Sequence, residues 1–234
     1  METSGLSEDV LRGTFVVIPA YNEAERLPGV LAALSTMYPN IVVVDDGSED
    51  ATFAAARKAT PHALRHIINR GQGAALQTGL EYALAHGARF VVTYDADGQH
   101  RAQDVALLLG PLARGECDVT LGSRFLGEAV DMPAVRRITL KLGVLFTRFF
   151  SRIRVTDTHN GLRGFTRRAA EQIQIRSDRM AHANEILDVI QHLKLSFREV
   201  PVRIQYTPYS LAKGQSSRNA IRIAFEYLAN RLAR

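Results

Sequence analysis

The alternation of short runs of β-branched residues with amphipathic stretches constrains the fold of this chain more than any other feature of its sequence. The apolar runs predict strands at 15–18, 41–44, 66–68, 90–94 and 118–122. The stretches between them predict helices at 24–37, 51–59, 72–86 and 103–114. Such alternation is typical of a parallel sheet with helices on both faces. We therefore expect an α/β fold built on a mostly parallel, Rossmann-like sheet.

The pattern changes after residue 123. We expect a long basic and apolar helix at 134–154, a glycine-containing stretch at 158–165, a helix near 183–193 and a strand near 197–205. A chain of 234 residues, 46% of them hydrophobic, can bury a full core of its own. The sequence therefore predicts a single domain over 1–234, in which the second half extends the first.

Polar clusters follow each of the first four predicted strands. They read PAYNE at 19–23, DDGSED at 45–50, NRGQG at 69–73 and DADGQH at 95–100. Ligands of parallel sheets bind outside the carboxyl ends of the strands. We therefore expect the four clusters to converge on one crevice.

Asp95 and Asp97 are separated by one residue and follow an apolar strand, so the strand end can direct both carboxylates into that crevice. Oxygen ligands this close together favour Mg²⁺ or Mn²⁺, and such an ion can bridge a diphosphate and neutralise its charge as it leaves. Gln99 and His100 stand where they can complete or flank the same shell. The sequence predicts a divalent-metal site at Asp95, Asp97 and Gln99.

Two of the other three clusters suit the remaining parts of a nucleotide. One carboxylate of the Asp45 and Asp46 pair can accept a hydrogen bond from a nucleobase N–H or a ribose hydroxyl. The glycines of NRGQG permit close backbone approach ahead of a helix N-terminus, where Arg70 can meet a phosphate. This loop matches neither G-x-G-x-x-G nor a P-loop, which weakens the dinucleotide-binding and NTPase interpretations.

Five segments occur in a fixed order, namely IPAYNE, VVVDDGSED, NRGQGAALQTGLEYA, YDADGQH and GSRF. In order and spacing they resemble glycosyltransferase family 2, and they are most similar to its dolichyl- or polyprenyl-phosphate sugar synthase branch, here in a soluble form without transmembrane helices. The resemblance implies a GT-A-like fold and a metal-dependent hexosyltransferase. It implies that 1–123 bind a nucleotide sugar and that 124–234 face the acceptor and a membrane.

The resemblance also implies roles for individual residues. Nucleoside contacts fall on Pro19, Ala20, Tyr21, Glu23 and Asp46, and the metal and diphosphate group falls on Asp95, Asp97 and Gln99. Arg124, in GSRF, is similar to an arginine that the branch directs toward phosphate. Glu185 is similar to the acidic residue that begins the helix beside the acceptor, and Lys213 occupies the place of a basic loop.

The stretch 157–163 falls where the branch has a DPxSGF-like segment. Arg163 suits a phosphate, because arginine forms bidentate contacts with phosphate oxygens. His159 and Asn160 fit a phosphate contact and a structural turn equally well. His182 lies three residues before Glu185, so in a helix it can orient that carboxylate.

Charge is divided unevenly along the chain. Residues 1–117 carry 9 Lys and Arg against 14 Asp and Glu, whereas residues 118–234 carry 20 against 10, so the two parts have net charges of −5 and +10. An acidic part suits metal ligation, and a basic part suits phosphates, a membrane surface or nucleic acid. An aromatic content of 7%, no tryptophan and no recognised nucleic-acid motif argue against nucleic acid as the partner.

The predicted helix at 134–154 is basic along one face and apolar along the adjoining one. The basic residues are Arg137, Lys141, Arg148 and Arg152, and the apolar ones are Ile138, Leu142, Leu145, Phe146, Phe149 and Ile153. Such a helix can lie in an anionic bilayer interface, or it can pack on the core with a solvated basic edge. A second apolar stripe occurs at Ile221, Phe225, Leu228 and Leu232.

No apolar run reaches the roughly 18 to 20 residues that span a bilayer, and the N-terminus lacks the pattern of a secretory signal. The single cysteine, Cys117, cannot form an internal disulfide. We expect a cytoplasmic protein that associates peripherally with the cytoplasmic membrane, with a small membrane protein as a candidate anchor.

These features together predict an inverting glycosyltransferase that moves a sugar from a nucleotide sugar to a polyprenyl phosphate, for cell-surface glycan assembly or modification. An ionised phosphate is already a nucleophile, so it needs positioning by Arg124, Arg163 or Lys213 more than it needs a base. One alternative is a family 2 enzyme that acts on a sugar hydroxyl, with Glu185 as general base. Another is a non-catalytic nucleotide-binding protein.

Overall fold

The computed structural model of the chain describes residues 5–151, 153–177 and 181–209. Within these residues one sheet contains β1 (Thr14–Ala20), β2 (Asn40–Asp45), β3 (Ala63–Arg65), β4 (Phe90–Thr93), β5 (Val119–Val130), β6 (Arg163–Thr166) and β7 (Phe197–Gln205). The strand order is β3-β2-β1-β4-β6-β5-β7. β6 pairs antiparallel with both β4 and β5, and the other pairings are parallel. The predicted α/β fold with a mostly parallel sheet is confirmed.

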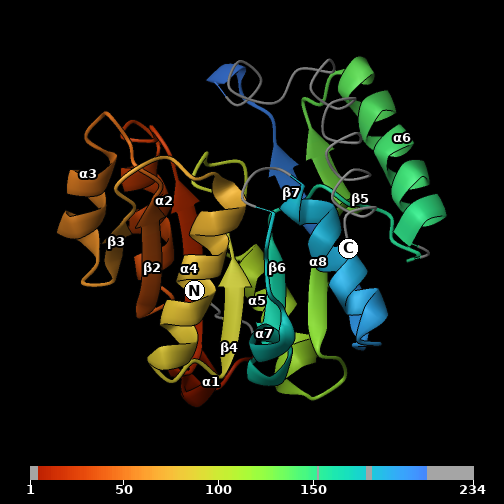
Figure 1. Cartoon of the computed structure of the whole chain (residues 1–234), viewed down its shortest axis with the longest axis horizontal. Helices are drawn as coiled ribbons and strands as arrows, with labels where there is room; N and C mark the ends of the chain where they lie inside the picture. Colours follow the sequence, from red (N-terminus) through yellow and green to blue (C-terminus); the bar gives the residue numbers. More distant parts are fainter. Residues whose placement is uncertain (1–4, 152, 178–180, 210–234) are drawn as a thin grey trace.

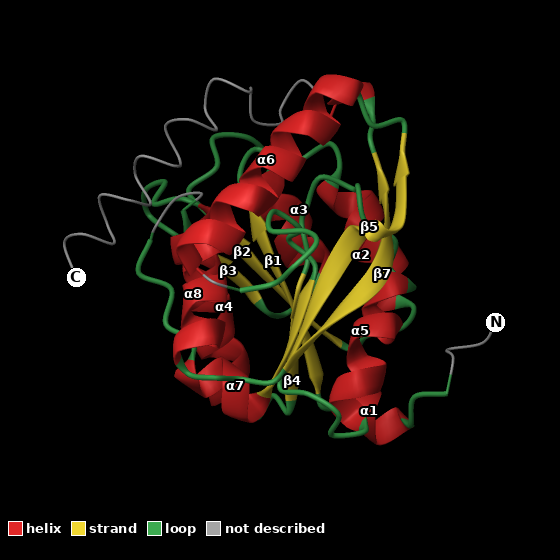
Figure 2. Ribbon diagram, turned by 90° about the vertical axis from the view of Figure 1, so that its right-hand side faces the viewer, coloured by secondary structure: helices red, strands yellow, loops and turns green. Residues whose placement is uncertain are grey.

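The helices of the described residues cover both faces of the sheet (Figures 1 and 2). They are α1 (Glu8–Arg12), α2 (Leu27–Ser35), α3 (Thr52–Ala59), α4 (Gln72–Ala85), α5 (Asp104–Ala113), α6 (Ala134–Ser151), α7 (Arg167–Gln172) and α8 (His182–His192). In Figure 2 the sheet is the middle layer, with α4, α7 and α8 on one side and α1, α2 and α5 on the other. The first half of the chain therefore forms the predicted sequence of strands and helices.

The core has two parts because successive strand residues point to opposite faces of the sheet. On β1, Val16 and Ile18 pack into the cluster under α2 and α5, whereas Phe15 and Val17 pack into the cluster under α4 and α8. Every residue of β1 is buried. A strand covered on both faces reads as a continuous apolar run, which is how the sequence predicted it.

The third strand lies three residues earlier than predicted, at 63–65 instead of 66–68. β3 pairs with β2 alone, and β2 ends at Asp45 opposite Arg65, so the chain leaves the sheet at that point. Ile67 is therefore fully exposed, and Ile68 is 69% exposed. Their apolar character predicted a strand where the chain forms a loop.

α6 lies at the end of the sheet opposite α3 and runs beside α8 (Figure 1). It packs on the protein through Leu140, Val144 and Thr147, and the Thr147 hydroxyl donates a hydrogen bond to Asn184 Oδ1 at 3.1 Å. The described part of the helix extends to Ser151, and Arg152, predicted on its basic face, lies outside the described residues. Ile153, predicted on its apolar face, is instead buried in the core.

Candidate functional site

The two loops after β1 and β2 are joined to each other by hydrogen bonds. The backbone N–H of Asn22 donates to Ser48 Oγ at 2.9 Å, and that of Glu23 donates to Thr52 Oγ1 at 2.7 Å. The backbone N–H of Glu49 donates in return to Asn22 Oδ1 at 3.0 Å. PAYNE and DDGSED therefore form one continuous wall at the carboxyl edge of the sheet.

Asp46 connects this wall to the glycine loop that precedes α4. Its carboxylate is buried and accepts hydrogen bonds from the backbone N–H of Arg70 at 3.0 Å and of Gly71 at 2.6 Å. The loops lie so close that a Cβ on Gly47, which has a φ of +72°, would stand 2.8 Å from the backbone nitrogen of Asn69. Glycine is therefore required at position 47, both for its left-handed conformation and for this contact.

In the acidic pair after β4, the Asp95 carboxylate is contacted by side chains from two segments of the chain. Gln72, the first residue of α4, donates from Nε2 to Asp95 Oδ1 at 3.0 Å, and His100 Nε2 lies 3.1 Å from Asp95 Oδ2. Asp97 Oδ1 accepts a hydrogen bond from the backbone N–H of Gln99 at 3.0 Å. The glycine loop and the Asp95–Asp97 loop therefore line one site, as the convergence of the four clusters predicted.

The two carboxylates of this pair differ in acidity. Burial and the charge of Asp95 raise the pKa of Asp97 to about 6. Burial acts in the same direction on Asp95, but the hydrogen bond from His100 and the neighbouring cations hold its pKa below the usual value. Two carboxylates that are buried next to each other repel, and a cation bound between them removes that repulsion.

The donor set fits a hard divalent cation. Over the described ranges, no three or more His, Cys, Asp or Glu side chains are grouped so that they could hold a metal ion by themselves. The protein would therefore supply the carboxylates of Asp95 and Asp97 with the neighbouring Gln99, and the remaining ligands would come from the substrate and water. Mg²⁺ is usually bound through one or two carboxylates together with substrate phosphates and water, in contrast to a full protein cage. The residues therefore fit an ion that binds together with a diphosphate.

The stretch at 158–163 supports Asp95 from the side of the sheet. The Thr93 hydroxyl donates to the carbonyl oxygen of Gly161 at 2.6 Å, which places Gly161 against the Asp95 carboxylate. A Cβ at position 161 would overlap that carboxylate. Arg163 lies beneath, where burial lowers its pKa to about 10, against the opposing effects of Asp95 and Asp157.

Two of the three arginines predicted to contact a phosphate, Arg124 and Arg163, point into the protein. Arg163 is 5% exposed and donates to the backbone carbonyl oxygens of Asn160, Thr158 and Ala183, at 3.1 to 3.2 Å. These bonds tie β6 to the preceding turn and to α8. The predicted contact of Arg163 with a phosphate remains a prediction.

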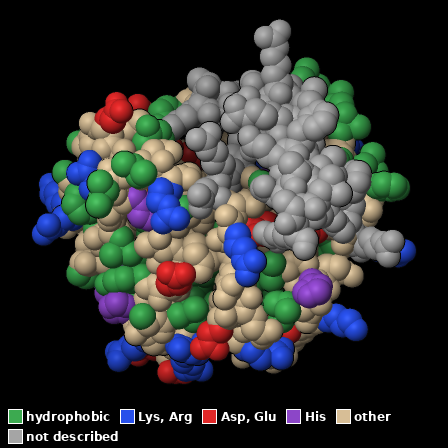
Figure 3. All heavy atoms as spheres, viewed as in Figure 1, with side chains coloured by type: hydrophobic (Ala, Val, Ile, Leu, Met, Phe, Trp, Pro, Cys, Tyr) green, Lys and Arg blue, Asp and Glu red, His purple; other side chains and the backbone are tan. Residues whose placement is uncertain are grey.

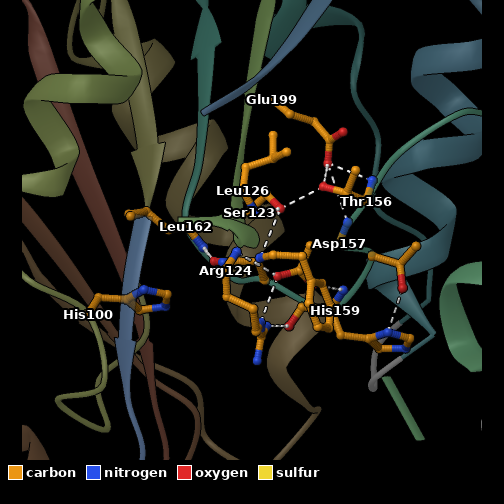
Figure 4. A network of polar contacts seen from close by, with 12 residues as sticks. His100, Ser123, Arg124, Leu126, Thr156, Asp157, His159, Leu162 and Glu199 are labelled. Atoms are coloured by element: carbon orange, nitrogen blue, oxygen red, sulfur yellow. Dashed lines mark hydrogen bonds and ion pairs between the residues drawn. The ribbon is translucent and has the colours of Figure 1, made fainter. Parts of the chain in front are cut away.

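Arg124 is also hydrogen-bonded within the protein, and Figure 4 shows its contacts with Asp157 and His159. Its side chain is 6% exposed and forms an ion pair with Asp157, from Nε to Oδ2 at 2.6 Å. It also donates to the Tyr206 hydroxyl at 2.6 Å and to the carbonyl oxygen of His159 at 2.9 Å. Burial acts to raise the pKa of Asp157, but the charge of Arg124 outweighs it and holds that pKa below the usual value.

Two further residues, Glu185 and Lys213, were predicted to lie on the acceptor side. Glu185 lies in the first turn of α8, as predicted, and is 4% exposed. Its Oε2 accepts hydrogen bonds from the backbone N–H groups of Arg176 at 3.1 Å and Ser177 at 2.7 Å. Lys213 lies outside the described residues.

The segment after β7 reaches the loop after β1. The Tyr209 hydroxyl donates to Glu23 Oε2 at 2.9 Å, and the Arg26 guanidinium lies 4.7 Å from the centre of the Tyr209 ring. Pro19 and Ala20 end β1, and Tyr21 beside them is 40% exposed. The residues predicted to contact the donor therefore lie together.

Sequence reasoning assigned no role to several residues of this site. Asp157, Tyr206 and His66 all contact predicted site residues, although they lie 20 to 82 positions away from them in the chain. No local sequence pattern predicts these contacts, because the sheet topology brings together residues that are far apart in the chain.

The chain matches the family model described as Glycosyl transferase family 2 over residues 15–174. It is 32% identical to the UDP-N-acetylglucosamine–dolichyl-phosphate N-acetylglucosaminyltransferase of Methanococcus voltae, over 92% of this chain and 94% of that protein. It is 31% identical to the polyprenol monophosphomannose synthase of Mycolicibacterium smegmatis, over 90% and 83% of the two chains. These names confirm the resemblance to the dolichyl- and polyprenyl-phosphate branch.

Solved structures support the fold. The glucosyl-3-phosphoglycerate synthase of Mycobacterium tuberculosis, in a complex with Mg²⁺ and uridine diphosphate, superposes with a TM-score of 0.68 at 21% identity, over 96% of this chain and 84% of that one. At this level of identity the likeness establishes the GT-A-like fold alone. From the match over 15–174 and the two relatives, we conclude that the chain belongs to glycosyl transferase family 2.

Proposed function

We propose that this chain is an inverting glycosyltransferase that moves a sugar from a nucleotide-sugar donor to a polyprenyl phosphate, for cell-surface glycan assembly or modification. The observation that carries the proposal is a continuous line of hydrogen bonds across the donor site. Asp46 accepts from the Gly71 N–H, and the next residue, Gln72, donates to Asp95. The nucleoside loop, the glycine loop and the acidic pair thus belong to one site.

On the donor side, residues 1–123 bind the nucleotide sugar. The PAYNE and DDGSED wall holds the nucleoside, and the loop at 69–73 with Arg70 faces its phosphates at the N-terminus of α4, where partial positive charge favours an anion. Asp95, Asp97 and Gln99 hold the divalent cation. When bound, Mg²⁺ or Mn²⁺ neutralises the charge that develops on the departing diphosphate.

On the acceptor side, residues 124–234 receive the polyprenyl phosphate. A phosphate monoester has a second pKa near 6 and is ionised at neutral pH, so it attacks the anomeric carbon without a general base, and the configuration inverts. The names of the dolichyl- and polyprenyl-phosphate relatives support this acceptor over a sugar hydroxyl. Glu185 Oε2 accepts hydrogen bonds from the backbone at 176 and 177. Arg124 and Arg163 add positive charge beneath this side, and Lys213 remains a candidate for direct contact.

The outer face of α6 fits an anionic lipid surface. The residues Val135, Ile138, Leu142, Leu145 and Phe149 repeat at intervals of three and four, and each is 60% to 78% exposed. Exposed Arg137, Lys141 and Arg148 flank this apolar stripe. Figure 3 shows hydrophobic side chains along the outer edge of the molecule over α6.

A helix with such a face lies in the headgroup region, with its apolar residues inserted and its basic residues near anionic lipids. Within the described residues no helix has the length and apolarity to span a bilayer. We therefore propose peripheral association with the cytoplasmic membrane, which brings the site to a lipid-linked acceptor. A small membrane protein can add a second anchor, and the predicted stripe at 221–232, which lies outside the described residues, is our candidate for binding it.

The test is a transfer assay with radiolabelled UDP- and GDP-sugars, Mn²⁺ and three acceptor classes: a short polyprenyl phosphate, the phosphate-free polyprenol and a panel of sugars. We expect label in the lipid-soluble product with polyprenyl phosphate alone. Glu185→Gln should lose less than the roughly 10²- to 10⁴-fold that removal of a general base costs. Label confined to sugar acceptors, together with near-total loss in Glu185→Gln, would establish the hydroxyl-directed alternative in place of our proposal.

A further inference from the structure

We propose that His66 is a positioning residue for donor binding, which acts through Asp46 on the backbone at 69–71. The inference rests on the proposed function in one respect, namely that the site binds a nucleoside diphosphate. It does not depend on which acceptor receives the sugar. His66 follows β3 and would not itself touch the donor.

His66 lies between two elements of the donor site. Its Nδ1 is 2.7 Å from Asp46 Oδ1, and its Nε2 is 3.0 Å from the Thr78 hydroxyl on α4. The ionised carboxylate can only accept, so Nδ1 carries a proton. In the neutral ring Nε2 then accepts from Thr78, which fixes both the tautomer and the orientation of the imidazole.

The loop after His66 depends on Asp46 for its conformation. Ile67 and Ile68 point into solvent, so apolar packing does not anchor this loop. The next residues are fixed through Asp46 instead, whose Oδ1 accepts from the Arg70 N–H and whose Oδ2 accepts from the Gly71 N–H. The His66 hydrogen bond therefore sets the orientation of the carboxylate that holds the loop.

Removal of that bond should weaken donor binding without unfolding the protein. The Asp46 carboxylate would lose the side-chain donor at Oδ1 and could rotate, which would release the loop that faces the phosphates. A hydrogen bond to a charged group is worth enough to change an affinity about 10- to 100-fold. We expect this loss in the affinity for UDP or GDP and in the donor KM, with kcat changed by less than about threefold.

Two substitutions separate the two contacts of the ring. Asparagine places its amide nitrogen near the position of Nδ1, so His66→Asn keeps a donor for Asp46 and loses Thr78. Glutamine places its amide nitrogen near Nε2, so His66→Gln keeps a partner for Thr78 and loses Asp46. His86→Gln, at the exposed C-terminal end of α4, serves as the matched control for a histidine outside the site.

The experiment is calorimetric titration of each variant with UDP and with GDP in excess Mn²⁺, alongside the thermal unfolding midpoint. We expect His66→Gln to bind about 10- to 100-fold more weakly than wild type, and His66→Asn to recover most of that loss at a similar unfolding midpoint. Equal affinities for the Asn and Gln variants, or losses that follow the unfolding midpoint, would overturn the inference alone. No binding of either nucleotide by the wild type would overturn the proposed function with it.

Discussion

The acidic strand ends of the first half and the arginines of the second half use charge in opposite ways. Asp95 keeps a side chain that is 26% exposed, and Asp97 beside it has a pKa raised to about 6, so this pair faces a site that favours a cation. Arg124 and Arg163 are 6% and 5% exposed and direct their hydrogen bonds to the protein itself. We infer that the acidic pair is arranged for a ligand, whereas the two arginines are hydrogen-bonded within the fold.

This difference in exposure follows from the position of each residue relative to the sheet. Asp95 and Asp97 come after β4 has ended, in a loop whose neighbours are other loops. Arg163 lies within β6, opposite Thr93 on β4 and Leu121 on β5, so its side chain starts inside the sheet. Residue type alone predicts a ligand in both cases, a cation for the two aspartates and a phosphate for Arg163. The position of each residue relative to the sheet decides which side chain can reach its ligand.

Asp97→Asn is the substitution for which we expect the largest loss of activity. We expect transfer to fall at least 10⁴-fold, about 5.5 kcal/mol, because the cation loses one of its two carboxylate ligands. The unfolding midpoint should stay within a few degrees of wild type, since the substitution removes a carboxylate whose charge is repelled by Asp95. Asp131→Asn, on an exposed turn, is the control and should leave both quantities unchanged.

Asp157→Asn tests the other side of the comparison. It leaves Arg124 buried without its anionic partner, and breaking such a pair typically costs about 3 to 5 kcal/mol of unfolding free energy. Equilibrium denaturation with urea would measure this loss. A variant as stable as wild type would show that Arg124 does not depend on Asp157 and is available to a ligand.

The same pair predicts a dependence on pH. Arg124 holds the pKa of Asp157 below its usual value of 3.8, so the folded protein binds fewer protons there than the unfolded chain. The stabilisation is fully present above about pH 4 and is lost as the pH falls through the lowered pKa. The stability difference between wild type and Asp157→Asn should therefore shrink below pH 4, and a constant difference from pH 7 to pH 3 would contradict this account.

The sequence predicted the donor side better than the acceptor side, for a physical reason. Strands buried on both faces and loops at their ends leave a local pattern, so β1, β2, β4 and the loops that follow them were predicted correctly. β6 escaped prediction because four residues with a glycine carry little periodicity. The partners of Arg124 and Asp46 are brought together by topology, which no spacing along the chain encodes.

Gly161→Ala probes the contact between the two halves. The added methyl group would overlap the Asp95 carboxylate, so either the carboxylate or the turn must move. We expect a loss of about 1 to 3 kcal/mol in stability, with weaker nucleotide binding in Mn²⁺. Gly29→Ala is the matched control, since nothing lies within 4 Å of its added methyl group. Equal behaviour of the two variants would show that Gly161 does not support Asp95.

The smallest effect per residue is expected on α6. Each of Arg137, Lys141 and Arg148 should contribute about 1 kcal/mol to binding of anionic vesicles, and salt should screen that contribution. Changing the three to Glu should release the protein in a vesicle co-sedimentation assay. The same reversal at Arg12, Arg57 and Lys58, which are exposed elsewhere, is the control. Salt-insensitive binding, or equal release by both sets, would remove α6 from the membrane model.

The central claim is that the acidic strand ends bind the donor diphosphate through a divalent cation. Its most direct test is calorimetric titration of the wild-type protein with UDP and GDP, once in Mn²⁺ and once in EDTA, with Asp97→Asn alongside. We predict binding of one nucleotide in Mn²⁺ that weakens at least about 100-fold in EDTA and to a similar extent in Asp97→Asn. Equal affinity in Mn²⁺ and EDTA, with Asp97→Asn binding as wild type does, would contradict the account.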